Sequence, residues 1–179
     1  MSIRDELQQI LYDEATLHAR IAELGAQISR DYADLNPVVV GVLNGVVIFI
    51  ADLLRELTIP LTVDFMAISQ YQSGAGSGSV QITKDLDNSI TGRHVLFVED
   101  VIDTGLSLNY LLRTLQTRQP ASIKVCVLFD RPYRRLANVP IAYQGFELPD
   151  LWVVGYGLDS QGHYRNLPVV GTLKPRNDF

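Results

Sequence analysis

The segment from Val95 to Leu108, which reads VLFVEDVIDTGLSL, constrains the fold more than any other part of the sequence. Four apolar residues come first, followed by two adjacent carboxylates and a loop with a third carboxylate, a hydroxyl and a glycine. Ser107 and an apolar repeat of helical spacing come next. A short apolar run that ends in polar residues and leads into such a repeat predicts a buried strand, a turn and a helix.

The turn has the composition of an anion-binding loop. We expect the backbone N–H groups of residues 103–107 and the positive end of the helix to hold an anion, with the Thr104 and Ser107 hydroxyls as further donors. A monophosphate fits this description. Glu99 and Asp100 cannot bind phosphate directly, so they suggest sugar hydroxyls and a hard cation as the rest of the ligand. The alternative is an ordinary turn in which one aspartate caps the helix, but a cap needs fewer polar residues than this loop holds.

Strand and helix patterns alternate along the chain. Apolar periodicity predicts helices over 14–33, capped by Asp13, and over 46–57 and 107–118, with strands over 38–43, 61–68, 95–98 and 123–129. Continuous apolar strands separated by helices predict an α/β fold with a mostly parallel sheet flanked by helices on both faces. Ligands of such sheets lie beyond the carboxyl ends of the strands, where 44–45, 99–100 and 130–131 fall.

Composition limits the class of protein. A chain of 179 residues, 47% of them hydrophobic, is long enough for one buried core and short for two. The net charge of −5 and the lack of a Lys/Arg cluster argue against a nucleic-acid surface. The same charge is unfavourable for an anionic substrate, and a divalent cation would compensate for it.

Neither a secretory signal nor a membrane span is predicted. The amino terminus is polar, and the most apolar run, Val38 to Leu54, is interrupted by glycine, asparagine and aspartate. The single cysteine, Cys126, lies in an apolar strand, so it is interpreted as a core residue and no internal disulfide can form. We therefore expect a soluble cytoplasmic protein without a membrane partner.

The segment EDVIDTGLS, residues 99–107, resembles the phosphoribosyl-diphosphate signature of type I phosphoribosyltransferases, and its wording is closest to their hypoxanthine-guanine branch. Walker and Gly-x-Gly-x-x-Gly motifs are absent. The tail, GFELPDLWVVGYGLD over 145–159 and YRNLP over 164–168, resembles the hood segment of the purine-specific members. The resemblance implies one phosphoribosyltransferase domain over 1–179, with a core of about 14–144, a hood of about 145–179 and a mobile loop of about 70–84.

The resemblance also implies a reaction and its residues. A 6-oxopurine, hypoxanthine or guanine, would displace pyrophosphate from phosphoribosyl diphosphate with the help of Mg²⁺, in a homodimer or homotetramer. Asp103 would exchange a proton with the purine as the catalytic residue. The other expected residues are Asp103, Thr104, Gly105, Leu106 and Ser107 for the 5′-phosphate, Glu99 and Asp100 for the ribose and cation, Arg131, Trp152 and Val153 for the base, Asn44, Gly45 and Arg165 for pyrophosphate, Gln70 and Tyr71 for the lid, and Asp159, with Glu99 and Asp100, for the metal.

Three positions depart from the pattern of the family. Asn44 stands where a lysine is usual, Gln70 where a serine is usual, and Arg131 where a lysine usually donates to the exocyclic oxygen of the base. An arginine could recognise O6 and N7 together, because its guanidinium is a planar fork. The preference among hypoxanthine, guanine and xanthine therefore stays open.

Three alternatives follow from the residues. The chain could be a type I phosphoribosyltransferase for another base, such as xanthine, or a nucleotide-binding regulatory paralogue of low activity, as its three departures allow. A phosphoacceptor receiver domain also places acids at strand ends. It would be shorter and would have a lysine after a late strand, whereas Arg131 and Pro132 stand there.

Overall fold

The computed structural model describes residues 2–71 and 79–175. Residues 72–78 of the predicted mobile loop lie outside the described residues, as do the side chains of the lid residues Gln70 and Tyr71. The elements in chain order are η1 (Ile3–Glu6), β1 (Leu7–Tyr12), α1 (Glu14–Asp31), β2 (Val38–Leu43), α2 (Val47–Glu56), β3 (Thr62–Tyr71), β4 (Ser79–Lys84), β5 (His94–Ile102), α3 (Leu106–Gln116), β6 (Ser122–Asp130), η2 (Pro132–Arg134), β7 (Tyr143–Glu147) and β8 (Val170–Leu173).

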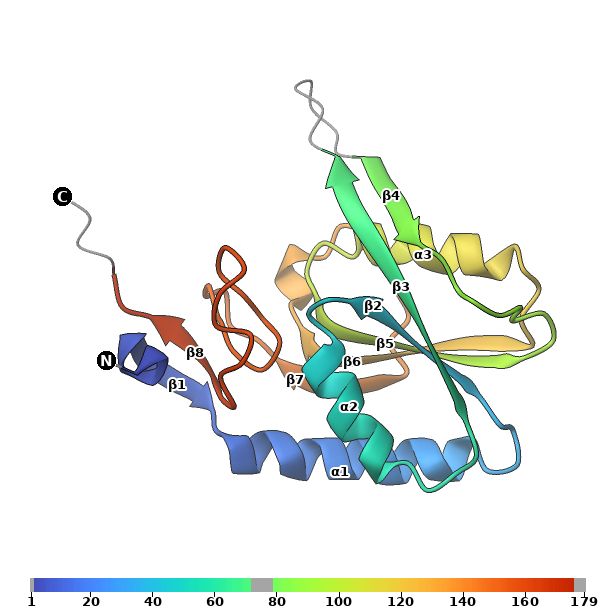
Figure 1. Ribbon diagram of the computed structural model, residues 1–179, viewed down its shortest axis with the longest axis horizontal. Helices are drawn as coiled ribbons and strands as arrows, with labels where there is room; N and C mark the ends of the chain where they lie inside the picture. The colour runs from blue at the N-terminus through green and yellow to red at the C-terminus, as the bar shows by residue number, and fades with distance from the viewer. Residues whose placement is uncertain (1, 72–78, 176–179) are drawn as a thin grey trace.

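The main sheet has six strands in the order β4-β3-β2-β5-β6-β7. The neighbours from β3 to β7 run parallel, and only β4 pairs antiparallel, with β3. Helices α1 and α2 lie on one face of this sheet and α3 on the other (Figure 1). The predicted α/β fold, with a mostly parallel sheet between helices, is confirmed.

Each face of the sheet has its own core. Val39 of β2 and Leu96 of β5 pack with the buried side of α1 and α2, whereas Val40 and Phe97 point to the face that α3 covers. Successive side chains of a strand point to opposite faces, which explains why these strands are apolar throughout. Burying one such side chain contributes about 1.5–3 kcal/mol. Cys126 belongs to the first core and is fully buried, and burial raises the pKa of its thiol.

Helix α1 begins where the sequence predicts it. The Asp13 side chain accepts a hydrogen bond from Thr16 N at 2.8 Å, which is an N-cap. The helix ends at Asp31, two residues before the predicted end, and Tyr32 is its C-cap. At its centre, a Cβ on Gly25 would lie 2.4 Å from Glu56 Cβ, so only glycine lets α1 approach the end of α2 this closely.

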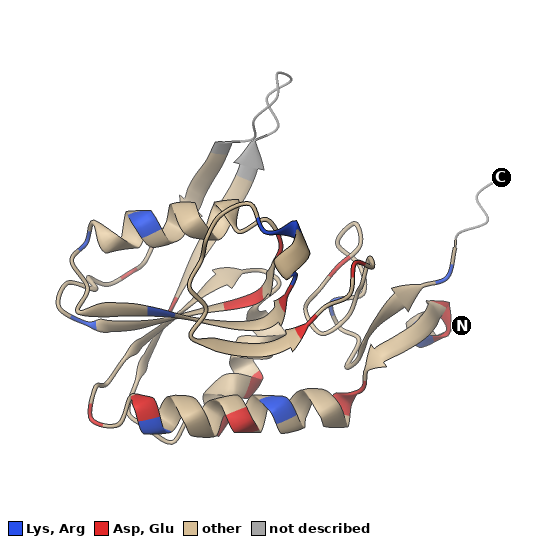
Figure 2. Cartoon of the chain, turned by 180° about the vertical axis from the view of Figure 1, so that it is seen from behind, with Lys and Arg blue, Asp and Glu red and all other residues tan. Residues whose placement is uncertain are grey.

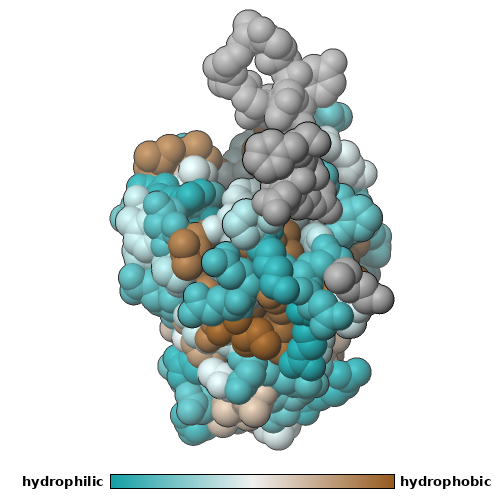
Figure 3. Space-filling model, turned by 90° about the vertical axis from the view of Figure 1, so that its left-hand side faces the viewer, coloured by the Kyte–Doolittle hydropathy of each residue, from teal (hydrophilic) through white to brown (hydrophobic). Residues whose placement is uncertain are grey.

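The amino terminus and the hood form a second, two-stranded sheet that the sequence patterns did not predict. Strand β1 pairs antiparallel with β8, and Leu7 packs with Val154 and Leu167 of the hood in a small apolar cluster. Residues 145–147, placed in the hood by the sequence, belong to β7 of the main sheet. The end of the molecule that carries both termini shows hydrophobic residues framed by hydrophilic ones (Figure 3).

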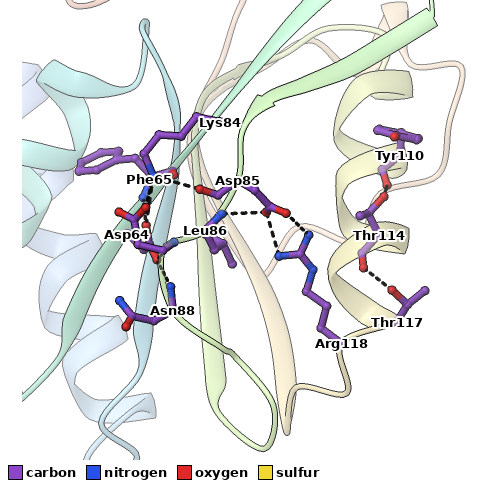
Figure 4. A network of polar contacts seen from close by, with 11 residues as sticks. Asp64, Phe65, Lys84, Asp85, Leu86, Asn88, Tyr110, Thr114, Thr117 and Arg118 are labelled. Carbon is purple, nitrogen blue, oxygen red and sulfur yellow. Dashed lines mark hydrogen bonds and ion pairs between the residues drawn. The ribbon is translucent and has the colours of Figure 1, made fainter.

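Polar contacts fix the base of the β3–β4 hairpin (Figure 4). Asp64 of β3 is 6% exposed and accepts hydrogen bonds from the backbone N–H groups of Phe65 and Asp87. Arg118, just after α3, donates two hydrogen bonds of 2.8 Å to the carboxylate of Asp85. These bonds hold the segment after β4 against both β3 and α3.

Acidic and basic residues are interspersed on the surface, as the row of charges along α1 illustrates (Figure 2). None of the helices in the described residues has the length and apolar character needed to cross a bilayer.

Candidate active site

One pocket of about 200 Å³ brings together seven of the predicted site residues. It lies where β5 and β6 end and the hood begins. All of its lining residues except Val101 and Leu158 were predicted from the sequence: Asp100, Val101, Asp103, Arg131, Trp152, Val153, Leu158, Asp159 and Arg165 line it. Residues from distant parts of the sequence thus meet in one place, because the carboxyl ends of parallel strands share an edge of the sheet.

The predicted phosphate loop connects β5 to α3. Gly105 is the N-cap of α3 with a φ of 76°, and no side chain caps the helix there, so the alternative of an aspartate cap is wrong. A Cβ on Gly105 would lie 2.9 Å from Arg135 Cδ and 3.2 Å from Ala137 O, so both the space and the backbone conformation require glycine. The helix begins at Leu106, one residue earlier than predicted. Leu106 N, the first N–H group of the helix, donates a long hydrogen bond of 3.4 Å to Thr104 Oγ1. The first turn of a helix is also the place where an anion can bind.

The segment after β6 supports this loop. Leu136 N and Ala137 N both donate to the carbonyl oxygen of Thr104, at 2.9 and 3.0 Å. Arg135 forms an ion pair with Asp130, which is 6% exposed and ends β6. The segment after β6 therefore holds the loop, by contacts that sequence patterns did not reveal.

Glu99 and Asp100 are part of β5, which continues to Ile102, four residues beyond the predicted end of the strand at Val98. Burial, with a contribution from the neighbouring Asp100, raises the pKa of Glu99 well above its ordinary value. Burial also raises the pKa of Asp100, against the effect of its hydrogen bond from Val101 N and the charge of Arg165. Only Asp100 lines the pocket. A cation or a hydroxyl donor close to either carboxyl group would favour its ionised form.

The turn after β2 lies against the same carboxylate. A Cβ on Gly45 would lie 1.9 Å from Asp100 Oδ2 and 3.4 Å from Arg165 Nη1, so the backbone comes as close as glycine permits. The peptide bond between Leu43 and Asn44 is cis. Asn44 and Gly45 do not line the pocket themselves, but Gly45 borders two residues that do.

Arg165 and Asp159 form the hood side of the pocket. Arg165 Nη2 lies 2.8 Å from Asp159 Oδ1, and Arg165 Nη1 donates to Gly157 O at 2.6 Å. The other oxygen of Asp159 accepts a hydrogen bond from Gly162 N at 2.7 Å. The structure thus pairs the predicted pyrophosphate-binding cation with the predicted metal ligand.

Arg131 and Trp152 form the far wall. Arg131 is 7% exposed, and its Nη2 donates to Leu151 O at 3.1 Å. Its Nε is buried without a hydrogen-bond partner among the described residues. Trp152 is 64% exposed, whereas Val153 beside it is buried. The exposed indole of Trp152 can stack on a planar ligand. The unused donor of Arg131 can bind an acceptor atom on the edge of that ligand.

The two oxygens of the Asp103 carboxylate have different surroundings. Its Oδ2 lies 3.7 Å from Arg134 Nη1, and its Oδ1 is buried without a hydrogen-bond partner among the described residues. Arg134 also pairs with Asp150 of the hood, at 2.7 Å. Sequence reasoning missed Arg134 and Asp150. The adjacent arginines at 134 and 135, close behind Arg131, were the signal that could have indicated them.

Comparisons with known proteins agree with this geometry. The family described as phosphoribosyl transferase domain matches residues 8–161. The hypoxanthine-guanine phosphoribosyltransferase of Bacillus subtilis (strain 168) is 43% identical over 97% of both chains. The hypoxanthine-guanine-xanthine phosphoribosyltransferase of Tritrichomonas foetus is 46% identical over 95% of this chain and 93% of its own.

A solved structure, the hypoxanthine phosphoribosyltransferase of Staphylococcus aureus, superimposes with a TM-score of 0.92 at 41% identity and covers 97% of this chain and 95% of its own. The likeness extends over the core, the hood and the paired amino-terminal strand. The chain therefore belongs to the type I phosphoribosyltransferase family, within its hypoxanthine-guanine branch.

Proposed function

We propose that the protein transfers the phosphoribosyl group of phosphoribosyl diphosphate to a ring nitrogen of hypoxanthine or guanine. The products are IMP or GMP and pyrophosphate, as expected of a purine salvage enzyme. The observation that carries this proposal is the single pocket, in which Asp103, Arg131 and Arg165 meet. The names of the relatives support the same class of substrate.

The donor set fits a magnesium ion that is bound together with its substrate. No group of three or more His, Cys, Asp or Glu side chains suited to a metal occurs within residues 2–71 and 79–175. Mg²⁺ usually takes one or two carboxylates, substrate oxygens and water, so one or two of the predicted ligands Asp159, Glu99 and Asp100 would suffice. When bound, Mg²⁺ would neutralise charge on the diphosphate.

Two separate groups of residues would bind the two phosphorylated ends of the substrate. The backbone N–H groups of residues 103–107 would bind the 5′-phosphate, helped by the positive end of α3. Gly45 and Arg165 would bind the pyrophosphate, with Asn44 beside them. Glu99 and Asp100 would accept hydrogen bonds from the ribose hydroxyls between them. We propose Gln70 and Tyr71 as lid residues, as the resemblance to the family implies.

The base would lie between Trp152 and the end of β5. The exposed indole offers a stacking face, and Val153 an apolar edge. Arg131, held by Leu151 O, would donate to O6 and N7 of the purine. The free Oδ1 of Asp103 would accept the proton that the ring nitrogen loses as its bond to C1′ forms. The chain then needs no protein nucleophile.

A steady-state assay tests the proposal. The purified chain is incubated with phosphoribosyl diphosphate and Mg²⁺, and with hypoxanthine, guanine, xanthine or adenine in turn. We expect IMP and GMP to form, adenine to be inert, and EDTA to abolish turnover. Xanthine as the preferred base would indicate the first alternative, and nucleotide binding without turnover the regulatory paralogue. Activity that persists without a metal would contradict the proposed use of Mg²⁺.

The proposal also covers domain organisation, cellular location and oligomeric state. We propose a single domain over residues 1–179 that works in the cytoplasm as a homodimer or homotetramer. Sedimentation velocity of the purified chain measures the oligomeric state, and a monomer at assay concentration would contradict this part.

A further inference from the structure

The hood turns sharply at residues 155–158. Gly155, Tyr156 and Gly157 have φ angles of 102°, 50° and 94° in succession. Glycine adopts such angles freely, but a tyrosine does so rarely, because its Cβ crowds the backbone. A residue other than glycine keeps a positive φ only where surrounding contacts stabilise that conformation. The turn therefore depends on contacts made by Tyr156.

The same turn positions the pyrophosphate side of the pocket. Gly157 exchanges two hydrogen bonds with Arg165: its N–H donates to Arg165 O at 2.9 Å, and its carbonyl accepts from Arg165 Nη1 at 2.6 Å. A Cβ on Gly157 would lie 2.1 Å from Gly45 O, so the hood turn packs directly on the turn after β2. Asp159, two residues further on, pairs with the Arg165 guanidinium. A shift of residues 155–158 would move both side chains.

A hydrogen bond connects this turn to helix α2. The Tyr156 side chain is 2% exposed, and its hydroxyl donates to Asp52 Oδ2 at 2.5 Å. Burial, and then the bond to Asp52, raises the pKa of Tyr156, so the hydroxyl keeps its proton and remains a donor. Arg55 Nη1 holds the other Asp52 oxygen at 2.8 Å, and His18 Nε2 lies 3.7 Å from Oδ2. A hydrogen bond to an ionised acceptor is stronger than a neutral one.

We propose that the Tyr156–Asp52 hydrogen bond is a clasp that fixes the hood turn 155–158 against the turn after β2. Tyr156 and Asp52 are then positioning residues, because neither lines the pocket and both act through Gly157 and Arg165. The inference rests on the proposed function, which assigns Arg165 to the pyrophosphate. Its consequence is selective: the clasp serves the binding of phosphoribosyl diphosphate and not that of the base.

The chain offers a matched control for the test. Tyr143 is also 2% exposed, and its hydroxyl donates to a carboxylate, Asp31 Oδ2, at 2.8 Å. This second bond joins β7 to α1 and is remote from the pocket lining. Tyr156→Phe and Tyr143→Phe therefore remove the same kind of bond, and only the first touches the hood turn.

The measurements are calorimetric titration with phosphoribosyl diphosphate and Mg²⁺, and the KM of each substrate. For Tyr156→Phe we expect Kd and KM for phosphoribosyl diphosphate to rise about tenfold, the scale of one lost hydrogen bond to a charged group. The KM for hypoxanthine should stay within about twofold of wild type, since no base contact is lost. Tyr143→Phe should lower the melting temperature similarly and leave both KM values unchanged.

Asp52 variants keep the test valid if Tyr156→Phe does not fold. Asp52→Ala should reproduce the tenfold effect, Asp52→Asn should recover part of it, and the double variant with Tyr156→Phe should be no worse than either single one, as for one shared bond. An unchanged Kd in the folded variants, or an equal rise in Tyr143→Phe, would overturn the clasp alone. A wild-type chain that binds no phosphoribosyl diphosphate would overturn the proposed function and the clasp with it.

Discussion

Asp103 Oδ2 lies 3.7 Å from Arg134 Nη1, while the other oxygen of the same carboxylate is buried and has no hydrogen-bond partner among the described residues. The guanidinium also pairs with Asp150, so it links the loop after β5 to the hood. This arrangement fixes one oxygen of Asp103 and leaves the other for a ligand. The unpartnered oxygen is the atom to which we assign proton exchange with the purine.

Replacing Asp103 by asparagine should lower kcat by about 10² to 10⁴, the usual contribution of a positioned acid or base. The amide keeps the shape of the side chain but cannot take the proton. Single-turnover rates with saturating hypoxanthine measure the effect. Asp87→Asn, the same change at a carboxylate that is 73% exposed and outside the pocket, is the control. An Asp103→Asn enzyme as fast as this control would contradict the assigned role.

Gly45→Ala should weaken the binding of phosphoribosyl diphosphate. Its Cβ would lie 1.9 Å from Asp100 Oδ2, so either the turn or the carboxylate must move away from the pocket. Calorimetry should show at least about a tenfold loss of affinity, equal to about 1.4 kcal/mol. Gly92→Ala is the control, because no atom lies within 4 Å of its Cβ position and only its φ of 69° is disfavoured. This variant should lose stability and keep its affinity.

Arg131→Lys should lower kcat/KM for the 6-oxopurines about tenfold, because the ammonium of lysine lacks the planar fork that would reach both Leu151 O and two acceptors of the base. Comparing hypoxanthine, guanine and xanthine shows which acceptors matter. Arg93→Lys tests the same exchange at an arginine that donates to a backbone carbonyl, Asn36 O, outside the pocket. Equal kcat/KM values for Arg131→Lys and wild type would remove Arg131 from base recognition.

The stability of the empty protein should depend on the ionisation of Glu99. Burial raises its pKa above the value in the unfolded chain, so its contribution to stability is complete below the unfolded pKa. That contribution is lost as the pH rises through the folded pKa, because a buried carboxyl group must then ionise. Glu99→Gln should therefore melt at a higher temperature than wild type near pH 8 and equally near pH 4.

Thermal melts across this range, with and without ligand, measure the effect. Phosphoribosyl diphosphate with Mg²⁺ should stabilise wild type more than Glu99→Gln, since we propose that the ionised carboxylate accepts hydrogen bonds from the ribose and binds the cation. Asp85→Asn is an informative control, because the hydrogen bond from Arg118 lowers the pKa of Asp85 and its stabilising contribution is lost towards acid pH instead. Parallel pH profiles of Glu99→Gln and wild type would contradict the prediction.

The sequence alone determined the layered α/β architecture and the position of the predicted phosphate loop, residues 103–107. The apolar run Val38–Leu43 and the apolar repeat in α1 predict which faces are buried. They can do so from short stretches of sequence, because strands and helices have fixed periods. The resemblance of residues 99–107 to a known signature identified the family. Strand alternation then predicted that Gly45, Asp100 and Arg131 share one edge of the sheet.

Only the tertiary structure decided how the hood joins this edge. The pairing of β1 with β8, the Tyr156–Asp52 bond and the contact of Arg134 with Asp150 join segments of different elements. Such contacts depend on where the packed core brings side chains, and a local pattern of polar residues carries no record of their partners. The sequence therefore named most residues of the site, and the fold determined which atoms are held in place and which remain available to a substrate.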